Sequence, residues 1–158
     1  MKPEPSTLKV FVYGTLKPGE ANYARYCDGY VESQTSAYVR GVLYALPAGY
    51  PAMTEADNKV KGVLLSFKNS NILDSLDRLE GYRSGRASSL NEYYRRLVWV
   101  YSLSDDPIDK AWAYFMTLEK IKQYQGVLVS SNWWTGLRNE ERLSWIYGSR
   151  NPFGDTFG

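Results

Sequence analysis

Residues 12–19 (VYGTLKPG) combine residue types that could bind an anion at the end of a strand. The preceding residues 8–13 are rich in β-branched and aromatic side chains and stop at Gly14, which predicts a strand that runs into a loop. Successive backbone N–H groups in such a turn can hold a carboxylate or a developing oxyanion. Thr15 adds a hydroxyl, and Gly14 lets a ligand approach the backbone closely. The alternative is an ordinary strand-to-loop turn; the segment is not a P-loop, because no Gly-Lys-Ser/Thr follows.

Glu80 is the candidate general base. Four apolar residues in the segment 71–81 fall at helical spacing: Ile72, Leu73, Leu76 and Leu79. Together with Gly81 as a helix stop, they predict an amphipathic helix. Glu80 shares the apolar face of this helix, where desolvation would raise the pKa of its carboxyl toward the range useful for a base. The alternative is a boundary residue near the helix end. Asp74 and Arg78, with Asp77 beside them, are expected to pair on the solvent side.

The residues that are missing narrow the chemistry further. The chain has no histidine, and Cys27 is its only cysteine. Ser-His-Asp and Cys-His nucleophile systems are therefore excluded, an internal disulfide cannot form, and a metal site would lack its preferred ligands. General acid–base work falls to Asp, Glu, Lys or Tyr, and neither a cofactor nor a metal is expected.

The charge and hydropathy patterns point away from large charged partners and from membranes. The net charge is +2 and the basic residues are scattered, so nucleic-acid binding is not expected. No apolar run approaches the roughly 20 residues of a membrane helix, and the polar, Pro-rich start has no signal-peptide hydrophobic stretch. These patterns predict a soluble, cytoplasmic protein.

The length of 158 residues predicts one domain that must position the loop and the helix. Residues 1–7 are expected to form a disordered lead. Alternation and chain breakers predict strands at 36–46, 59–67, 93–103 and 111–116, turns at 47–51 and 55–58, a hairpin bend at 104–107, short helices at 21–27 and 137–147, and a polar loop at 82–91. The segment 119–124 is ambiguous, and residues 148–158 are expected to be a loose end.

The predicted strand 93–103 carries two adjacent arginines, Arg95 and Arg96, which alternation places on opposite faces. One of them could pair with a pocket carboxylate while the other is solvated; surface pairing of both is the alternative. Tyr114, in the next predicted strand, could reach a cavity or simply pack.

Several motifs occur together in one order. Tyr-Gly-Thr-Leu-Lys-Pro-Gly at 13–19 precedes Gly-Val-Leu-Tyr at 41–44 and Tyr50-Pro51, and Leu-Asp-x-x-Glu-Gly at 76–81 precedes a Tyr-x-Arg before a valine-rich strand. This series resembles the gamma-glutamylcyclotransferase-like family, and especially its short branch that begins with Tyr-Gly-Thr-Leu. The resemblance covers residues 8–118. It implies an α+β fold, a small mixed β-barrel with flanking helices. Residues 119–158 lie beyond the shared motifs, and we expect this extension to pack on the same domain; the alternatives are that it covers the pocket or forms an interface.

The resemblance also implies a reaction and roles for residues. A γ-glutamyl amide would be cyclised to 5-oxoproline with release of an amine or amino acid, a small-molecule substrate. Tyr13, Gly14, Thr15 and Leu16 would bind this substrate, Glu80 would be the base, and Tyr50 and Tyr114 are further candidates for the cavity wall. Intramolecular attack needs no protein nucleophile, which agrees with the absence of histidine. The alternatives are a non-catalytic binding module of the same fold, or an interaction protein acting through the Trp-rich tail at 133–145.

Overall fold

The computed structural model describes residues 7–136. The predicted helix 137–147, the loose end 148–158 and nearly all of the predicted lead lie outside these residues. The elements follow in the order β1 (Leu8–Val12), α1 (Tyr23–Tyr26), β2 (Val31–Ala45), β3 (Pro51–Phe67), α2 (Ile72–Leu79), the 3₁₀ turn η1 (Ser88–Leu90), β4 (Tyr94–Ser102), β5 (Pro107–Phe115), α3 (Leu118–Gln123) and β6 (Val127–Leu128). No helix of the described part is both long enough and apolar enough to cross a membrane.

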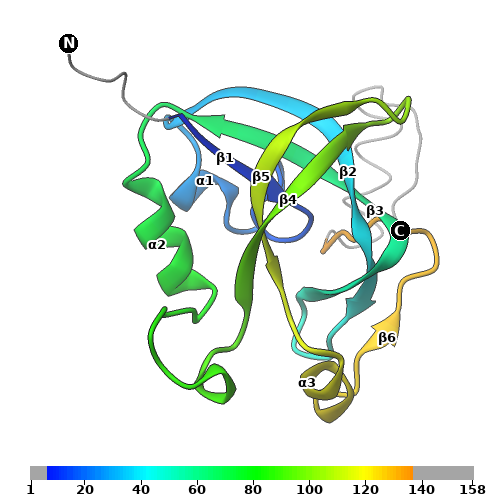
Figure 1. Ribbon diagram of the computed structural model, residues 1–158. Helices are drawn as coiled ribbons and strands as arrows, with labels where there is room; N and C mark the ends of the chain where they lie inside the picture. The colour runs from blue at the N-terminus through cyan, green and yellow to red at the C-terminus, as the bar shows by residue number, and fades with distance from the viewer. Residues whose placement is uncertain (1–6, 137–158) are drawn as a thin grey trace.

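Five strands form a closed, mixed barrel (Figure 1), as the family resemblance implied. The strand order is β3-β1-β5-β4-β2, and a direct pairing between β2 and β3 closes the circle. β1 and β5 run parallel, whereas the other neighbours run antiparallel. β6 adds to β2 outside the closed set. Every barrel strand therefore has a neighbour on both sides, and the β2–β3 pair has the most extensive register.

The hairpin of β2 and β3 is longer than predicted. The turn at 47–51 is confirmed in outline: the Leu46 N–H donates to the Tyr50 carbonyl at 2.9 Å, and Gly49 has φ +104°. The predicted turn at 55–58 is wrong, because these residues continue β3. Their side chains are exposed, so polar residues occupy this part of the strand without a desolvation cost. The pairing with β2 shifts its register here: Thr54 lies opposite Val42 and Lys59 opposite Arg40, so residues 55–58 are extra residues in β3 at this point.

The predicted helix at 71–81 is confirmed as α2, which lies beside α1 on one side of the barrel in Figure 1. Leu76 is fully buried, and Ile72, Leu73 and Leu79 pack against the core. The expected solvent-side pairing is wrong. Asp77 points instead to Arg95, and the Arg78 guanidinium donates to the Ser75 hydroxyl at 3.4 Å.

The ambiguous segment at 119–124 is helical, because Thr117 caps α3 by accepting a hydrogen bond from the Lys120 N–H at 3.2 Å. Ile121 anchors α3 in the core. Further along, the Val129 N–H donates to the Leu43 carbonyl at 2.9 Å, and Trp134 is buried in a second core cluster. The described part of the tail therefore packs on the barrel.

Candidate active site

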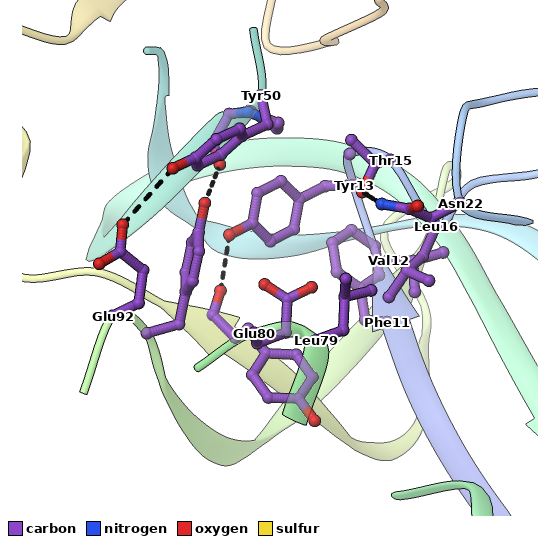
Figure 2. A pocket seen from close by; sticks show the side chains of 14 residues that line it. Phe11, Val12, Tyr13, Thr15, Leu16, Asn22, Tyr50, Leu79, Glu80 and Glu92 are labelled. Carbon is purple, nitrogen blue, oxygen red and sulfur yellow. Dashed lines mark hydrogen bonds between the residues drawn. The ribbon is translucent and has the colours of Figure 1, made fainter. Parts of the chain in front are cut away.

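A cavity of about 250 Å³ lies between the loop after β1 and the end of α2. All seven residues singled out from the sequence line it: Tyr13, Gly14, Thr15, Leu16, Tyr50, Glu80 and Tyr114. Seven others complete the wall: Phe11, Val12, Asn22, Pro51, Leu79, Glu92 and Tyr93. Figure 2 shows the Glu80 carboxylate pointing into this space, with Tyr13 and Thr15 above it. The structure thus brings the predicted loop and the predicted base into one site.

The loop from Tyr13 to Leu16 lines the cavity and carries backbone donors. Its turn is closed by the Lys17 N–H, which donates to the Gly14 carbonyl at 3.0 Å, and Asn22 fixes Thr15 by donating to its hydroxyl oxygen at 2.9 Å. Within the described residues, the N–H groups of Gly14, Thr15 and Leu16 take part in no hydrogen bond. A backbone N–H seldom stays unpaired inside a protein. Since these three donors have no partner among the described residues, they are available to an anionic ligand.

Glu80 is held in place through its backbone. It follows the last residue of α2, and the Tyr93 N–H donates to its carbonyl at 3.2 Å. The next residue, Gly81, accepts from the Glu92 N–H at 2.9 Å and has φ +67°. A Cβ at Gly81 would lie 2.9 Å from the Cβ of Glu92, so only glycine permits both this backbone conformation and the close approach. The backbone contacts with residues 92 and 93, just before β4, therefore fix the position of the backbone that carries the Glu80 side chain.

The Glu80 carboxylate lacks any hydrogen bond or ion pair to a residue within 7–136. Burial raises the pKa of Glu80 from an ordinary value of 4.5 to about 8, and the negative charge of Asp77 adds to this rise. A carboxyl group with this pKa can take up and release a proton near neutral pH. Desolvation has the larger part, as expected for a carboxylate surrounded by Tyr13, Leu79 and Tyr93.

This pKa predicts how stability depends on pH. The pKa of Glu80 is higher in the folded than in the unfolded state, so its favourable contribution is complete below pH 4.5 and is lost as the pH rises toward 8. Glu80→Gln has no charge to bury. We expect the variant to melt at a higher temperature than the wild type at pH 9 and at a similar one at pH 4, as measured by circular dichroism. An equal difference at both pH values would contradict the ionisation of a buried Glu80.

Three tyrosine hydroxyls surround this carboxylate and donate to fixed acceptors. The hydroxyls of Tyr13, Tyr93 and Tyr114 donate to the Tyr114 carbonyl at 2.7 Å, the Pro51 carbonyl at 2.6 Å and the Asp77 carboxylate at 2.6 Å. Burial is the largest cause that raises the pKa of all three hydroxyls above the ordinary value. They are therefore neutral at pH 8, which leaves Glu80 as the group of this inner wall that titrates near neutrality.

Asp77 was not recognised from the sequence as part of the site. Its carboxylate accepts from the Tyr114 hydroxyl and from two nitrogens of the Arg95 guanidinium, at 2.8 Å and 3.2 Å. Arg95 therefore pairs with Asp77, which does not itself line the cavity, rather than with a carboxylate of the lining, while Arg96 lies exposed near Glu55. This network fixes Tyr114 behind Glu80. The Leu-Asp-x-x-Glu-Gly spacing could have indicated that Asp77 lies near Glu80, because it puts the two residues almost one helical turn apart.

Lys17 is a second residue that the sequence did not reveal. Its side chain is buried; the ammonium donates to the Trp134 carbonyl, lies 3.5 Å from the centroid of the Trp133 ring and is 3.9 Å from Glu20. Burial lowers the pKa of Lys17 to about 8, against the opposing effect of Glu20. Glu20 also accepts from the Thr135 hydroxyl at 2.6 Å. Residues 133–135 of the tail thus contact the loop region through Lys17 and Glu20.

The site therefore combines unpaired backbone donors, an isolated carboxylate with a pKa near neutrality, and neutral hydroxyls. Such a set can hold a carboxylate or an oxyanion and can move a proton. Between residues 7 and 136, no group of three His, Cys, Asp or Glu side chains is arranged to hold a metal ion.

The model of one protein family, gamma-glutamyl cyclotransferase, AIG2-like, matches residues 10–136. No curated protein matches the chain significantly.

Solved structures share the fold at low sequence identity. YkqA from Bacillus subtilis is 20% identical, with a TM-score of 0.57, and covers 92% of this chain, which spans only 44% of YkqA. The AIG2-like protein from Mus musculus is 19% identical, with a TM-score of 0.59 and coverage of 75% of this chain and 82% of its own. A gamma-glutamyl cyclotransferase is 16% identical, with a TM-score of 0.53 and coverage of 97% and 94%.

Proposed function

Because the chain belongs to the gamma-glutamyl cyclotransferase, AIG2-like family, we propose that it cyclises a γ-glutamyl amide to 5-oxoproline and releases the amine. The substrate's own α-amino group attacks its γ-carbonyl carbon. The five-membered ring forms as the amide C–N bond breaks. An intramolecular attack already has a high effective concentration, so the protein needs to supply orientation, charge stabilisation and proton transfer, but no nucleophile.

One observation carries the proposal: the residues that bear an unpaired carboxylate and unpaired backbone donors line the same cavity. Glu80 lacks a protein partner, and the N–H groups of Gly14, Thr15 and Leu16 are also unpaired among the described residues. A γ-glutamyl group satisfies both at once, because it brings an α-ammonium that can donate to Glu80 and oxygens that can accept from the loop.

The proton balance of the reaction suits a single carboxylate. The attacking nitrogen starts as an ammonium and ends as a lactam N–H, so it loses two protons, and the leaving nitrogen gains two as it becomes an ammonium. Glu80 can carry both protons in succession: each time it takes a proton from the attacking nitrogen and gives it to the leaving nitrogen, which regenerates the carboxylate. A pKa of about 8 makes both transfers feasible near neutral pH. The negative charge that develops on the γ-carbonyl oxygen is stabilised by the N–H groups of the loop.

The test is the release of 5-oxoproline from a panel of γ-glutamyl amines and γ-glutamyl peptides. Free amine or amino acid is quantified in the same samples. The proposed reaction produces 5-oxoproline and amine in equal amounts, with no free glutamate. Release of glutamate in place of 5-oxoproline would show that water attacks, which would replace cyclisation with hydrolysis.

Asp77→Asn should move the acid limb of the pH–rate profile. The base must be ionised to accept a proton, so the wild-type kcat/KM is expected to fall below about pH 8. Asp77 raises the pKa of Glu80, so removal of its charge lowers that pKa and shifts the limb to lower pH. Asp74→Asn removes a charge from the exposed face of α2 and should leave the limb in place. If the acid limb of the pH–rate profile does not move in Asp77→Asn, that limb does not report the ionisation of Glu80.

A further inference from the structure

Glu92 is a second carboxylate in the cavity wall, and the proposed reaction gives it no role. It lies next to Tyr93, two residues before the start of β4, and is half-buried. Its carboxylate accepts from the Tyr124 hydroxyl at 2.8 Å and, at 3.5 Å, from that of Tyr50. No described Lys or Arg forms an ion pair with Glu92. The nearby Lys120 and Arg86 bond instead to the backbone or side chain of Asn91 and to the Gly81 carbonyl.

The position of Glu92 relative to the loop determines which part of a substrate reaches it. Figure 2 shows Thr15 and Glu92 at opposite ends of the cavity, with Glu80 between them. If the loop holds the glutamyl group and Glu80 faces the reacting nitrogen atoms, the leaving amine extends toward Glu92. Tyr124 is 37% exposed, so this end of the site opens toward solvent and leaves room for a chain that continues beyond the amide.

The negative charge at the Glu92 end of the cavity distinguishes between leaving amines of different charge. The described lining includes Glu80 and Glu92 but no Lys or Arg, and the phenol ring of Tyr50 stands beside Glu92. A carboxylate flanked by hydroxyls and aromatic rings is a favourable environment for an ammonium group. A leaving group that carries a carboxylate would instead face the charge of Glu92, and the described lining holds no Lys or Arg to pair with that carboxylate.

We propose that Glu92, with Tyr50 and Tyr124, binds a second ammonium group on the leaving amine, so that the preferred substrates are γ-glutamyl derivatives of diamines. This inference rests on the proposed cyclotransferase reaction, since it takes its orientation from the loop and Glu80. In this assignment Glu92 determines specificity and takes no part in the proton transfers.

Three γ-glutamyl amides of equal chain length test the proposal: those of 1,4-diaminobutane, butylamine and 4-aminobutanoate. Their far ends are cationic, neutral and anionic. For the wild type at low salt, we expect kcat/KM for the diamine derivative to exceed that for the butylamine derivative by about tenfold, the size of one charge-assisted contact at a partly exposed site. The 4-aminobutanoate derivative should fall below both. Added salt should compress the differences.

Glu92→Gln keeps an oxygen that can accept from the two tyrosine hydroxyls but removes the charge. We expect the ratio between the diamine and butylamine derivatives to fall to about one in this variant. Glu32→Gln is the matched control, because it removes one negative charge from an exposed position of β2 and should keep the wild-type ratio. Equal rates for all three amides in the wild type, or a preference that survives Glu92→Gln, would overturn the subsite.

Dissociation constants separate this inference from the reaction itself. They are measured by calorimetry for the three amides on Glu80→Gln, in which proton transfer is blocked. Tighter binding of the diamine derivative, without 5-oxoproline from any amide on the wild type, would exclude the proposed reaction and retain the cation subsite. Equal dissociation constants would overturn the subsite even if the wild type turns over all three.

Discussion

Glu80→Gln should lower kcat for 5-oxoproline release by about 10²–10⁴-fold while changing the dissociation constant of the substrate little. The amide occupies nearly the same volume as the carboxyl group, so the cavity keeps its shape. It cannot accept the proton of the α-ammonium, and the attacking nitrogen then stays protonated and unreactive. Single-turnover measurements of 5-oxoproline at pH 8, together with calorimetric binding, would separate the chemical step from binding.

Glu80→Asp tests whether the position of the carboxylate matters as well as its charge. It retains a carboxylate but withdraws it by one methylene group, so we expect activity between those of the wild type and Glu80→Gln. Equal kcat values for wild type and Glu80→Gln, with folding confirmed by circular dichroism, would remove Glu80 from the proton transfers. Weaker binding with unchanged kcat would assign it to substrate binding instead.

Local sequence patterns were sufficient to predict the parts of the site that depend on neighbouring residues. Apolar spacing located α2, and Gly81 marked its end, because helix periodicity and a positive φ are properties of a short segment. The strand that ends at Gly14 was found in the same way. The barrel itself was inferred from a family resemblance, since periodicity does not specify which strands pair.

The partners of Asp77 and Lys17 could not be predicted because they are distant in sequence. Asp77 meets Arg95 and Tyr114 only after β4 and β5 have paired, with Arg95 opposite Tyr114 in the register. Lys17 meets Trp134 only once the tail has crossed the barrel. On the isolated sequence, Asp77 resembled one member of a solvent-side pair. The error at 55–58 has the same origin: these turn-forming residues lie at a register shift inside β3, which pairs with β2 on both sides of them.

Gly14→Ala should lower kcat/KM by about 10²-fold, because it disturbs the loop whose N–H groups are proposed to stabilise the oxyanion. A Cβ at this position would lie 2.6 Å from Cγ and 2.9 Å from Cδ of Pro51, and both distances are too short for contact. The loop or the start of β3 must therefore shift. Steady-state kinetics of the cyclisation would measure the loss, and thermal melting would follow the cost of overpacking, about 1–3 kcal/mol.

A double-variant cycle distinguishes steric displacement from a general loss of folding. Pro51→Ala removes the Cγ and Cδ atoms that the new methyl group would meet, while the residue 51 carbonyl that accepts from Tyr93 is retained. The double variant Gly14→Ala/Pro51→Ala should therefore recover most of the activity that Gly14→Ala loses, and the two changes should be strongly non-additive. Additive losses would mean that contact with Pro51 is not what disturbs the loop. Full activity in Gly14→Ala alone would show that close approach to the backbone at Gly14 is not required, and the loop would lose its proposed role as the oxyanion site.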